Sequence, residues 1–159
     1  MQRLLNTQGR LLGIDFGDKR TGLAVSDKTR LISSGIGQIS VGGMQRTAAR
    51  IVEIVREQGV VGGIVVGLPV NMNGSEGPRA EHARKFASIL GDLLSSASDI
   101  PEMPIVMLDE RMTTMVASRY LNETDTRGQK RKGVIDTLSA QIILQDALDR
   151  LKNMSVRKD

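Results

Sequence analysis

The stretch Arg10-Leu-Leu-Gly-Ile-Asp-Phe-Gly-Asp-Lys-Arg-Thr-Gly-Leu-Ala-Val-Ser-Asp27 decides how the rest of the chain is interpreted. Its two apolar runs, residues 11–16 and 23–25, flank a turn that begins at Gly17 and ends at Gly22. Apolar runs on both sides of a short glycine-bracketed turn are typical of a hairpin. The pattern therefore predicts two antiparallel strands at the start of the fold.

Asp15 lies inside the first apolar run, where an ionised carboxylate is costly unless a cation or hydrogen-bond donors meet it. Gly17 and Gly22 leave room beside it, and their backbone N–H groups can point at an anion. A carboxylate at a strand end beside such a turn suits a metal or phosphate site. The simpler alternative is that Asp15 only accepts hydrogen bonds from the backbone of the turn.

Length and composition predict one globular domain over residues 1–159, with a core at about 10–152 and flexible tails at 1–9 and 153–159. No apolar run approaches the roughly 20 residues that span a bilayer, and the first ten residues lack a secretory pattern. A trimmed organellar targeting sequence at 1–9 is an open alternative. The chain has no cysteine, which excludes thiolate chemistry and fits a cytoplasmic protein.

The net charge of +4 and the pI of about 9.8 favour, weakly, a polyanionic partner. Aromatic residues are nearly absent, which argues against a base-stacking platform for single strands. If the partner is nucleic acid, we expect backbone phosphates and duplex or junction shape to be recognised.

Beyond the hairpin, the apolar periodicity alternates between strands and helices, which is typical of an α/β fold. The strand over 60–66 follows a helix and is therefore expected to run parallel to the first strand. The expected elements are strands at 36–41, 60–66 and 104–108, helices at 44–58, 78–96, 113–122 and 134–152, and a basic loop at 123–133.

Three acidic positions break an apolar context: Asp15, one of Asp109 and Glu110, and Asp136. The side chains of Asp109 and Glu110 should point to opposite faces, so only one can join a common site. Asp136 is the lone charge on a small apolar face at the start of the last helix. Favourable interaction with the helix dipole is the alternative explanation for its position.

Carboxylates without cysteine or a suitable histidine favour Mg²⁺ or Mn²⁺ over Zn²⁺, and such ions serve phosphodiester hydrolysis. Basic side chains near these acids could hold a polyanion, although a basic loop can also serve solubility alone. The candidates for nucleic-acid binding are Lys19, Arg20, Arg111, Arg127, Lys130, Arg131 and Lys132.

Five segments in one order make the chain recognisable. They are Gly13-Ile-Asp-Phe-Gly-Asp-Lys-Arg-Thr-Gly-Leu-Ala-Val-Ser-Asp27, Ile64-Val-Val-Gly-Leu-Pro-Val-Asn-Met-Asn-Gly74, Ala83-Arg-Lys-Phe86, Asp109-Glu-Arg111 and Gly133-Val-Ile-Asp-Thr-Leu-Ser-Ala140. Over about residues 10–150, the chain resembles the YqgF (RuvX) family of ribonuclease H-like proteins, relatives of the RuvC Holliday-junction resolvases.

The resemblance implies an α/β fold: a mixed five-stranded sheet, with three antiparallel strands followed by two parallel ones, and helices on both faces. It implies that Asp15, Glu110 and Asp136 are catalytic and bind Mg²⁺ or Mn²⁺. The implied activity is an endonuclease that processes the 5′ end of precursor 16S rRNA, with Holliday-junction resolution as an alternative. Two positions depart from pattern: Asn73 replaces a frequent Asp, and the strand ending at Gly67 lacks the resolvases' carboxylate.

Two other interpretations stay open. The Asp-x-Gly-x-x-x-x-Gly hairpin also resembles the phosphate loop of actin-like and sugar-kinase ATPases, which are generally much longer proteins. A ribosome-assembly factor could also use the same basic surface to bind rRNA without cleaving it. The expected partner is precursor rRNA or a ribosomal particle, with branched DNA as the alternative and no membrane.

Overall fold

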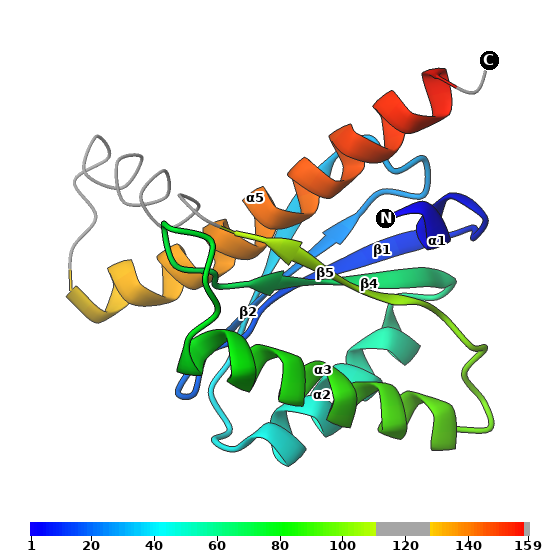
Figure 1. Ribbon diagram of the computed structural model, residues 1–159. Coiled ribbons are helices and arrows are strands. Elements are labelled where there is room, and N and C mark those ends of the chain that lie inside the picture. The colour runs from blue at the N-terminus through cyan, green and yellow to red at the C-terminus, as the bar shows by residue number, and fades with distance from the viewer. Residues whose placement is uncertain (111–127, 158–159) are drawn as a thin grey trace.

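The computed structural model describes residues 1–110 and 128–157, and leaves the side chains of 128–133 undescribed. The described chain holds a five-stranded sheet in the order β3-β2-β1-β4-β5 (Figure 1). The strands are β1 (Arg10–Asp15), β2 (Thr21–Ser26), β3 (Ser33–Ile39), β4 (Val61–Leu68) and β5 (Ile105–Asp109). The first three strands are antiparallel and β1, β4 and β5 are parallel, which confirms the predicted mixed sheet.

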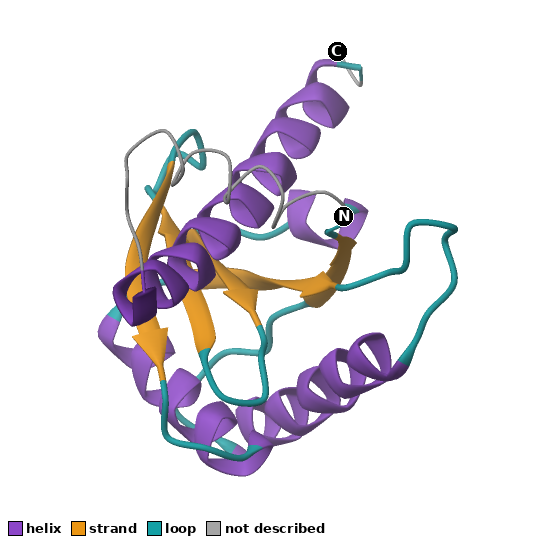
Figure 2. Cartoon of the chain, turned by 90° about the vertical axis from the view of Figure 1, so that its left-hand side faces the viewer, coloured by secondary structure: helices purple, strands orange, loops and turns teal. Residues whose placement is uncertain are grey.

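Helices cover both faces of this sheet, as Figure 2 shows edge-on. Helices α2 (Met44–Glu57) and α3 (Pro78–Ser96) lie on one face, and α5 (Gly128–Val156) crosses the other. None of the helices in the described ranges could cross a membrane.

The central strand β1 is buried on both sides. Its successive side chains point to opposite faces of the sheet, and helices cover both faces. Leu12 and Ile14 pack in the core under α2 and α3, whereas Leu11 packs in a second core beneath α5. Strand β4 is buried throughout in the same way. Strands covered on both faces read as continuous apolar runs, which is why their sequence lacks alternation.

Glycines let α5 lie directly against the backbone of the sheet. A Cβ at Gly13 would lie 2.7 Å from Cβ of Leu144, and a Cβ at Gly22 would overlap the carbonyl oxygen of Asp136. A Cβ at Gly35 would press on the side chain of Thr137. These three glycines belong to β1, β2 and β3, so α5 contacts three adjacent strands and Asp136 is held close to β2.

Both predicted tails contain helical residues in the described chain. Residues 1–9 include a short helix, α1 (Gln2–Leu5), and Leu4 is fully buried in the core beneath α5. The end of α5 reaches Val156, within the predicted tail. Met1 and Leu5 are partly buried against the same core, and three apolar residues in so short a polar stretch give too little periodicity to predict the helix.

The last helix also begins earlier than predicted. Helix α5 starts at Gly128, inside the segment 123–133 that was expected to be a loop. Asp136 therefore lies in the third turn, so interaction with the end of the helix dipole does not explain its position. The predicted helix over 113–122 lies outside the described residues.

The close approach of α5 to β1 gives a direct test. Replacing Gly13 with alanine should destabilise the protein by about 1–3 kcal/mol, because the new methyl group must displace Leu144. Gly91→Ala in α3 is the matched control: its Cβ would meet Ile105 at 3.6 Å, and alanine in a helix interior should stabilise by about 0.5–1 kcal/mol. Urea unfolding measures both, and equal effects would contradict the described packing.

Candidate active site

Asp15 and Glu110 lie at the same edge of the sheet, where the parallel strands end. Asp15 is the last residue of β1, and Glu110 directly follows β5. Ile14 lies beside Val66, and Leu68 lies beside Asp109, so the three strands end level with one another. The backbone N–H of Glu110 donates to the carbonyl of Leu68 at 3.1 Å and continues this alignment. This edge is where open α/β sheets bind ligands.

Glu110 reaches Asp15 across β4 because Gly67 leaves its path open. A Cβ at Gly67 would overlap the Glu110 carboxyl group, lying 3.1 Å from its Cδ atom. The Glu110 carboxyl therefore lies against bare backbone and forms a side-chain hydrogen bond with Asp15. The middle strand contributes no acid of its own, but its glycine provides the space in which two acids from the neighbouring strands meet.

Both carboxyl groups have raised pKa values. Burial is the main cause that raises the pKa of Asp15 to about 6, and the negative charge of Asp136 raises it further. Burial also raises the pKa of Glu110 to about 8, together with the charge of Asp15. The shared hydrogen bond lowers the pKa of Asp15 and raises that of Glu110, so protonated Glu110 donates to the Asp15 carboxylate.

The negative charge of Asp136 acts on Asp15, and the Asp136 carboxylate itself forms an ion pair with an arginine. The Arg20 Nε donates to Oδ2 of Asp136 at 2.8 Å, and Arg20 lies in the turn between β1 and β2. Burial raises the pKa of Asp136, and Arg20 opposes that rise. Within residues 1–110 and 128–157, no three acidic or histidine side chains are placed to hold one metal ion together.

The donor set nevertheless fits a hard divalent cation. Mg²⁺ is commonly held by one or two carboxylates together with water and substrate phosphates. The Asp15–Glu110 pair provides two adjacent carboxyl groups for such a cation. Asp136 would have to move closer to this pair to complete a three-acid site.

The predicted basic residues are only partly described. Lys19 is exposed in the turn between β1 and β2, next to Arg20. Lys130, Arg131 and Lys132 belong to the first turns of α5, but their side chains are outside the described part of the chain, as are Arg111 and Arg127 altogether.

Arg79 is a site residue that the sequence analysis missed. It follows Pro78 in the first turn of α3, and its charge lowers the pKa of both Asp15 and Glu110. Phe16, next to Asp15, stacks on Phe86 of α3 with ring centroids 4.4 Å apart, which fixes α3 beside the site. The sequence did carry a signal for Arg79, because α3 begins soon after the loop at the carboxyl end of β4, where ligand sites are expected.

Two other contacts lie at the rim of this edge. Nδ1 of His82 in α3 lies 3.4 Å from Oδ1 of Asp18 in the β1–β2 turn. Asn73 accepts hydrogen bonds from the backbone N–H and the hydroxyl of Ser75, at 3.0 and 2.6 Å. Its side chain therefore organises the loop after β4.

The raised pKa values predict a stability that falls with rising pH in metal-free protein. The folded state favours the protonated acids, so their contribution is full below about pH 4 and is lost as the pH rises to about 8. Glu110→Gln cannot ionise and should reduce the stability lost between pH 5 and pH 8 by about 1–4 kcal/mol. Urea unfolding with a chelator measures this, and an unchanged loss would contradict the buried acid pair.

Comparisons with known proteins agree with this architecture. The model of the RuvX family, described as "Holliday junction resolvase", matches residues 9–150. Among solved structures, RuvC from Thermus thermophilus has a TM-score of 0.53 at 14% identity, over 91% of this chain and 96% of that one. The yeast mitochondrial Holliday junction resolvase Ydc2 has a TM-score of 0.51 at 12% identity, over 99% of this chain and 89% of that one. These two structures confirm the resolvase-like fold.

Curated relatives are much more similar in sequence. A protein of Pelotomaculum thermopropionicum is 46% identical over 141 residues, which are 88% of this chain and 86% of the relative. One from Ruminiclostridium cellulolyticum is 41% identical over 143 residues, 89% of this chain and 95% of the relative. Both carry the name "Putative pre-16S rRNA nuclease". The family match and these identities, over nearly the whole length, show that the chain belongs to the RuvX family.

Proposed function

We propose that this chain is a metal-dependent endonuclease that hydrolyses phosphodiester bonds of structured nucleic acid. We propose further that it processes the 5′ end of precursor 16S rRNA during ribosome biogenesis in the cytoplasm. The observation that carries the chemistry is the contact between Asp15 and Glu110 at the carboxyl edge of the sheet. The substrate assignment is supported by the name of the curated relatives.

In this proposal Asp15, Glu110 and Asp136 are the catalytic acids and the ligands of Mg²⁺ or Mn²⁺. Such an ion, when bound, activates a water molecule and stabilises the leaving oxygen in phosphodiester hydrolysis. Protonated Glu110 must lose its proton before both carboxylates can bind a cation. Arg79 favours that loss, because its positive charge stabilises both ionised carboxyl groups.

Arg20 has a double role in the proposal. It neutralises Asp136 in the free protein, and its guanidinium group is also suited to a phosphate. A substrate phosphate that attracts Arg20 would free Asp136 to act as the third acid. The remaining proposed contacts to the nucleic-acid backbone are Lys19, Arg111, Arg127, Lys130, Arg131 and Lys132.

A branched DNA substrate is the second candidate, because the family description names Holliday junction resolution. Both candidates require the same acids and differ only in the nucleic acid that is cleaved. Offering precursor 16S rRNA and a four-way DNA junction to the same protein therefore separates them.

The acids can be tested by cleavage of precursor 16S rRNA in the presence of Mn²⁺. We expect Asp15→Asn, Glu110→Gln and Asp136→Asn each to lower the rate at least about 100-fold, because each removes a charge from the metal site. Asp92→Asn changes an exposed acid of α3 and should leave the rate unchanged. If all three variants cleave the RNA at the wild-type rate, the carboxylate mechanism is overturned.

The open path over β4 gives a sharper test, because it changes no charged residue. Gly67→Ala places a methyl group where the Glu110 carboxyl lies, so the flexible Glu110 side chain must move away from Asp15. We expect activity to fall about 100-fold while the protein stays folded, since misplacing a catalytic group by about 1 Å has effects of that size. Gly91→Ala is the matched control, and an active Gly67→Ala variant would contradict the proposed geometry.

A further inference from the structure

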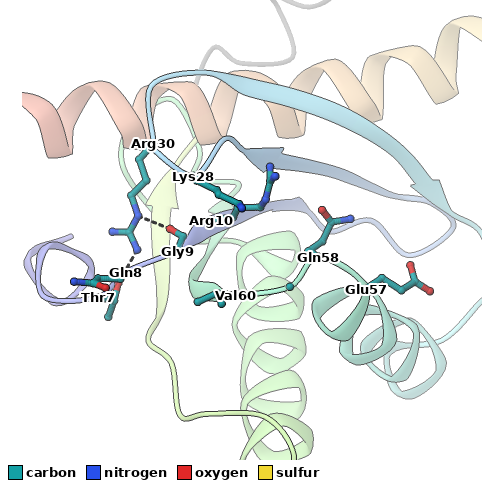
Figure 3. Close-up of a pocket in the computed structure, with 10 residues that line it drawn as sticks. Thr7, Gln8, Gly9, Arg10, Lys28, Arg30, Glu57, Gln58 and Val60 are labelled. Atoms are coloured by element: carbon teal, nitrogen blue, oxygen red, sulfur yellow. Dashed lines mark hydrogen bonds between the residues drawn. The ribbon is translucent and has the colours of Figure 1, made fainter.

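A second charged site lies at the opposite end of the sheet, where β1 and β4 begin. It is a pocket of about 880 Å³ between the segment before β1, the turn between β2 and β3, and the end of α2 (Figure 3). Arg10 at the start of β1 lines this pocket, whereas Asp15 at the end of β1 belongs to the acidic edge. Five residues of extended strand separate them by about 17 Å, so the two sites are distinct.

The pocket is strongly basic. Arg10, Lys28 and Arg30 line it, and Glu57 is the only acid among its lining residues. Glu57 already accepts a hydrogen bond from Nη1 of Arg50 at 3.3 Å. Across the parts of the chain that the structure describes, none of the three cations has a carboxylate within ion-pair distance. Among the described residues, therefore, no carboxylate pairs with the positive charges of this pocket.

Arg30 is held in place rather than left free in solvent. Its Nε donates to the carbonyl of Gly9 at 2.7 Å, and its two terminal nitrogens donate to Leu4 O at 2.7 Å and Thr7 Oγ1 at 2.9 Å. Figure 3 shows this side chain at one wall of the pocket, pointing towards Gly9 and Thr7. Each terminal nitrogen keeps a second N–H for another acceptor.

The turn that carries Lys28 and Arg30 is rigidly built. Arg30 has a φ of +59°, a left-handed conformation that non-glycine residues rarely adopt. The Asp27 carboxylate stabilises it by accepting the backbone N–H groups of Leu31 and Ile32 at 2.8 and 2.9 Å. These hydrogen bonds hold the pKa of Asp27 well below its usual range, and burial alone lowers the pKa of Arg30. A strained, well-ordered turn next to uncompensated charge is typical of a ligand site.

We propose that this pocket is a phosphate-binding site, in which Arg10 and Lys28 contact the phosphate and fixed Arg30 strengthens the positive field. The phosphate could come from the backbone of a nucleic acid or from a free nucleotide, because the same charges recognise both. The site is separate from the acidic edge, so it would bind whether or not the chain cleaves nucleic acid.

The test uses the full chain with Asp15→Asn, so that no bound nucleic acid is cleaved. Amide NMR spectra follow Gly9 and Gly59 during titration with a short duplex and, separately, with adenosine monophosphate. We expect the amide signals of Gly9 and Gly59 to shift with increasing concentration of at least one of these ligands until binding is saturated. If only the duplex does so, the source is the nucleic-acid backbone. If the mononucleotide does so too, or alone, the pocket accepts free phosphate compounds.

Lys28→Ala, an exposed position, and Lys85→Ala on α3 form a charge-matched pair in the same background. Lys28→Ala should weaken binding read at Gly9, and should make the dependence of log K on log salt for a duplex shallower by about 0.9. Lys85→Ala should leave the affinity read at Gly9 unchanged. The proposal is overturned if neither ligand shifts the pocket amides, or if the two variants behave alike.

Discussion

The hydrogen bond between Asp15 and Glu110 is the interaction on which the site depends, and it is unfavourable to build. Two carboxyl groups leave water and meet in a partly buried position, which raises both pKa values. As the pH rises through these raised pKa values, ionisation of the buried acids lowers the stability of the fold. The two apolar cores above and below β1 supply the stability that keeps the strand ends level and the acids together.

The first hairpin and the parallel direction of β4 could be predicted because their signals are local, whereas the complete mixed sheet was implied by the family resemblance. Apolar periodicity, glycine turns and the acidic residues that interrupt apolar runs all lie within short windows of sequence, and the family resemblance chose Glu110 over Asp109. The start of α5 was predicted wrongly, because residues 128–133 carry charges and glycines instead of an apolar face.

The details of the site could not be predicted because they depend on contacts between distant segments. The path of Glu110 over Gly67 requires the register of three strands. The pairing of Arg20 with Asp136 joins residues 116 positions apart. Arg79 acts on the acids only because the fold brings the first turn of α3 close to them.

The bare glycine backbone under α5 has a consequence for how this protein can vary. A helix that touches three strands this closely is fixed in rotation as well as in height. Each inserted or deleted residue turns everything beyond it by about 100° and shifts it by about 1.5 Å. An insertion or deletion between Asp136 and Leu144 would therefore move the Asp136 carboxylate away from its place beside β2, even if every residue type were retained. Length variation in this family should be confined to loops, with the interior of α5 kept at constant length.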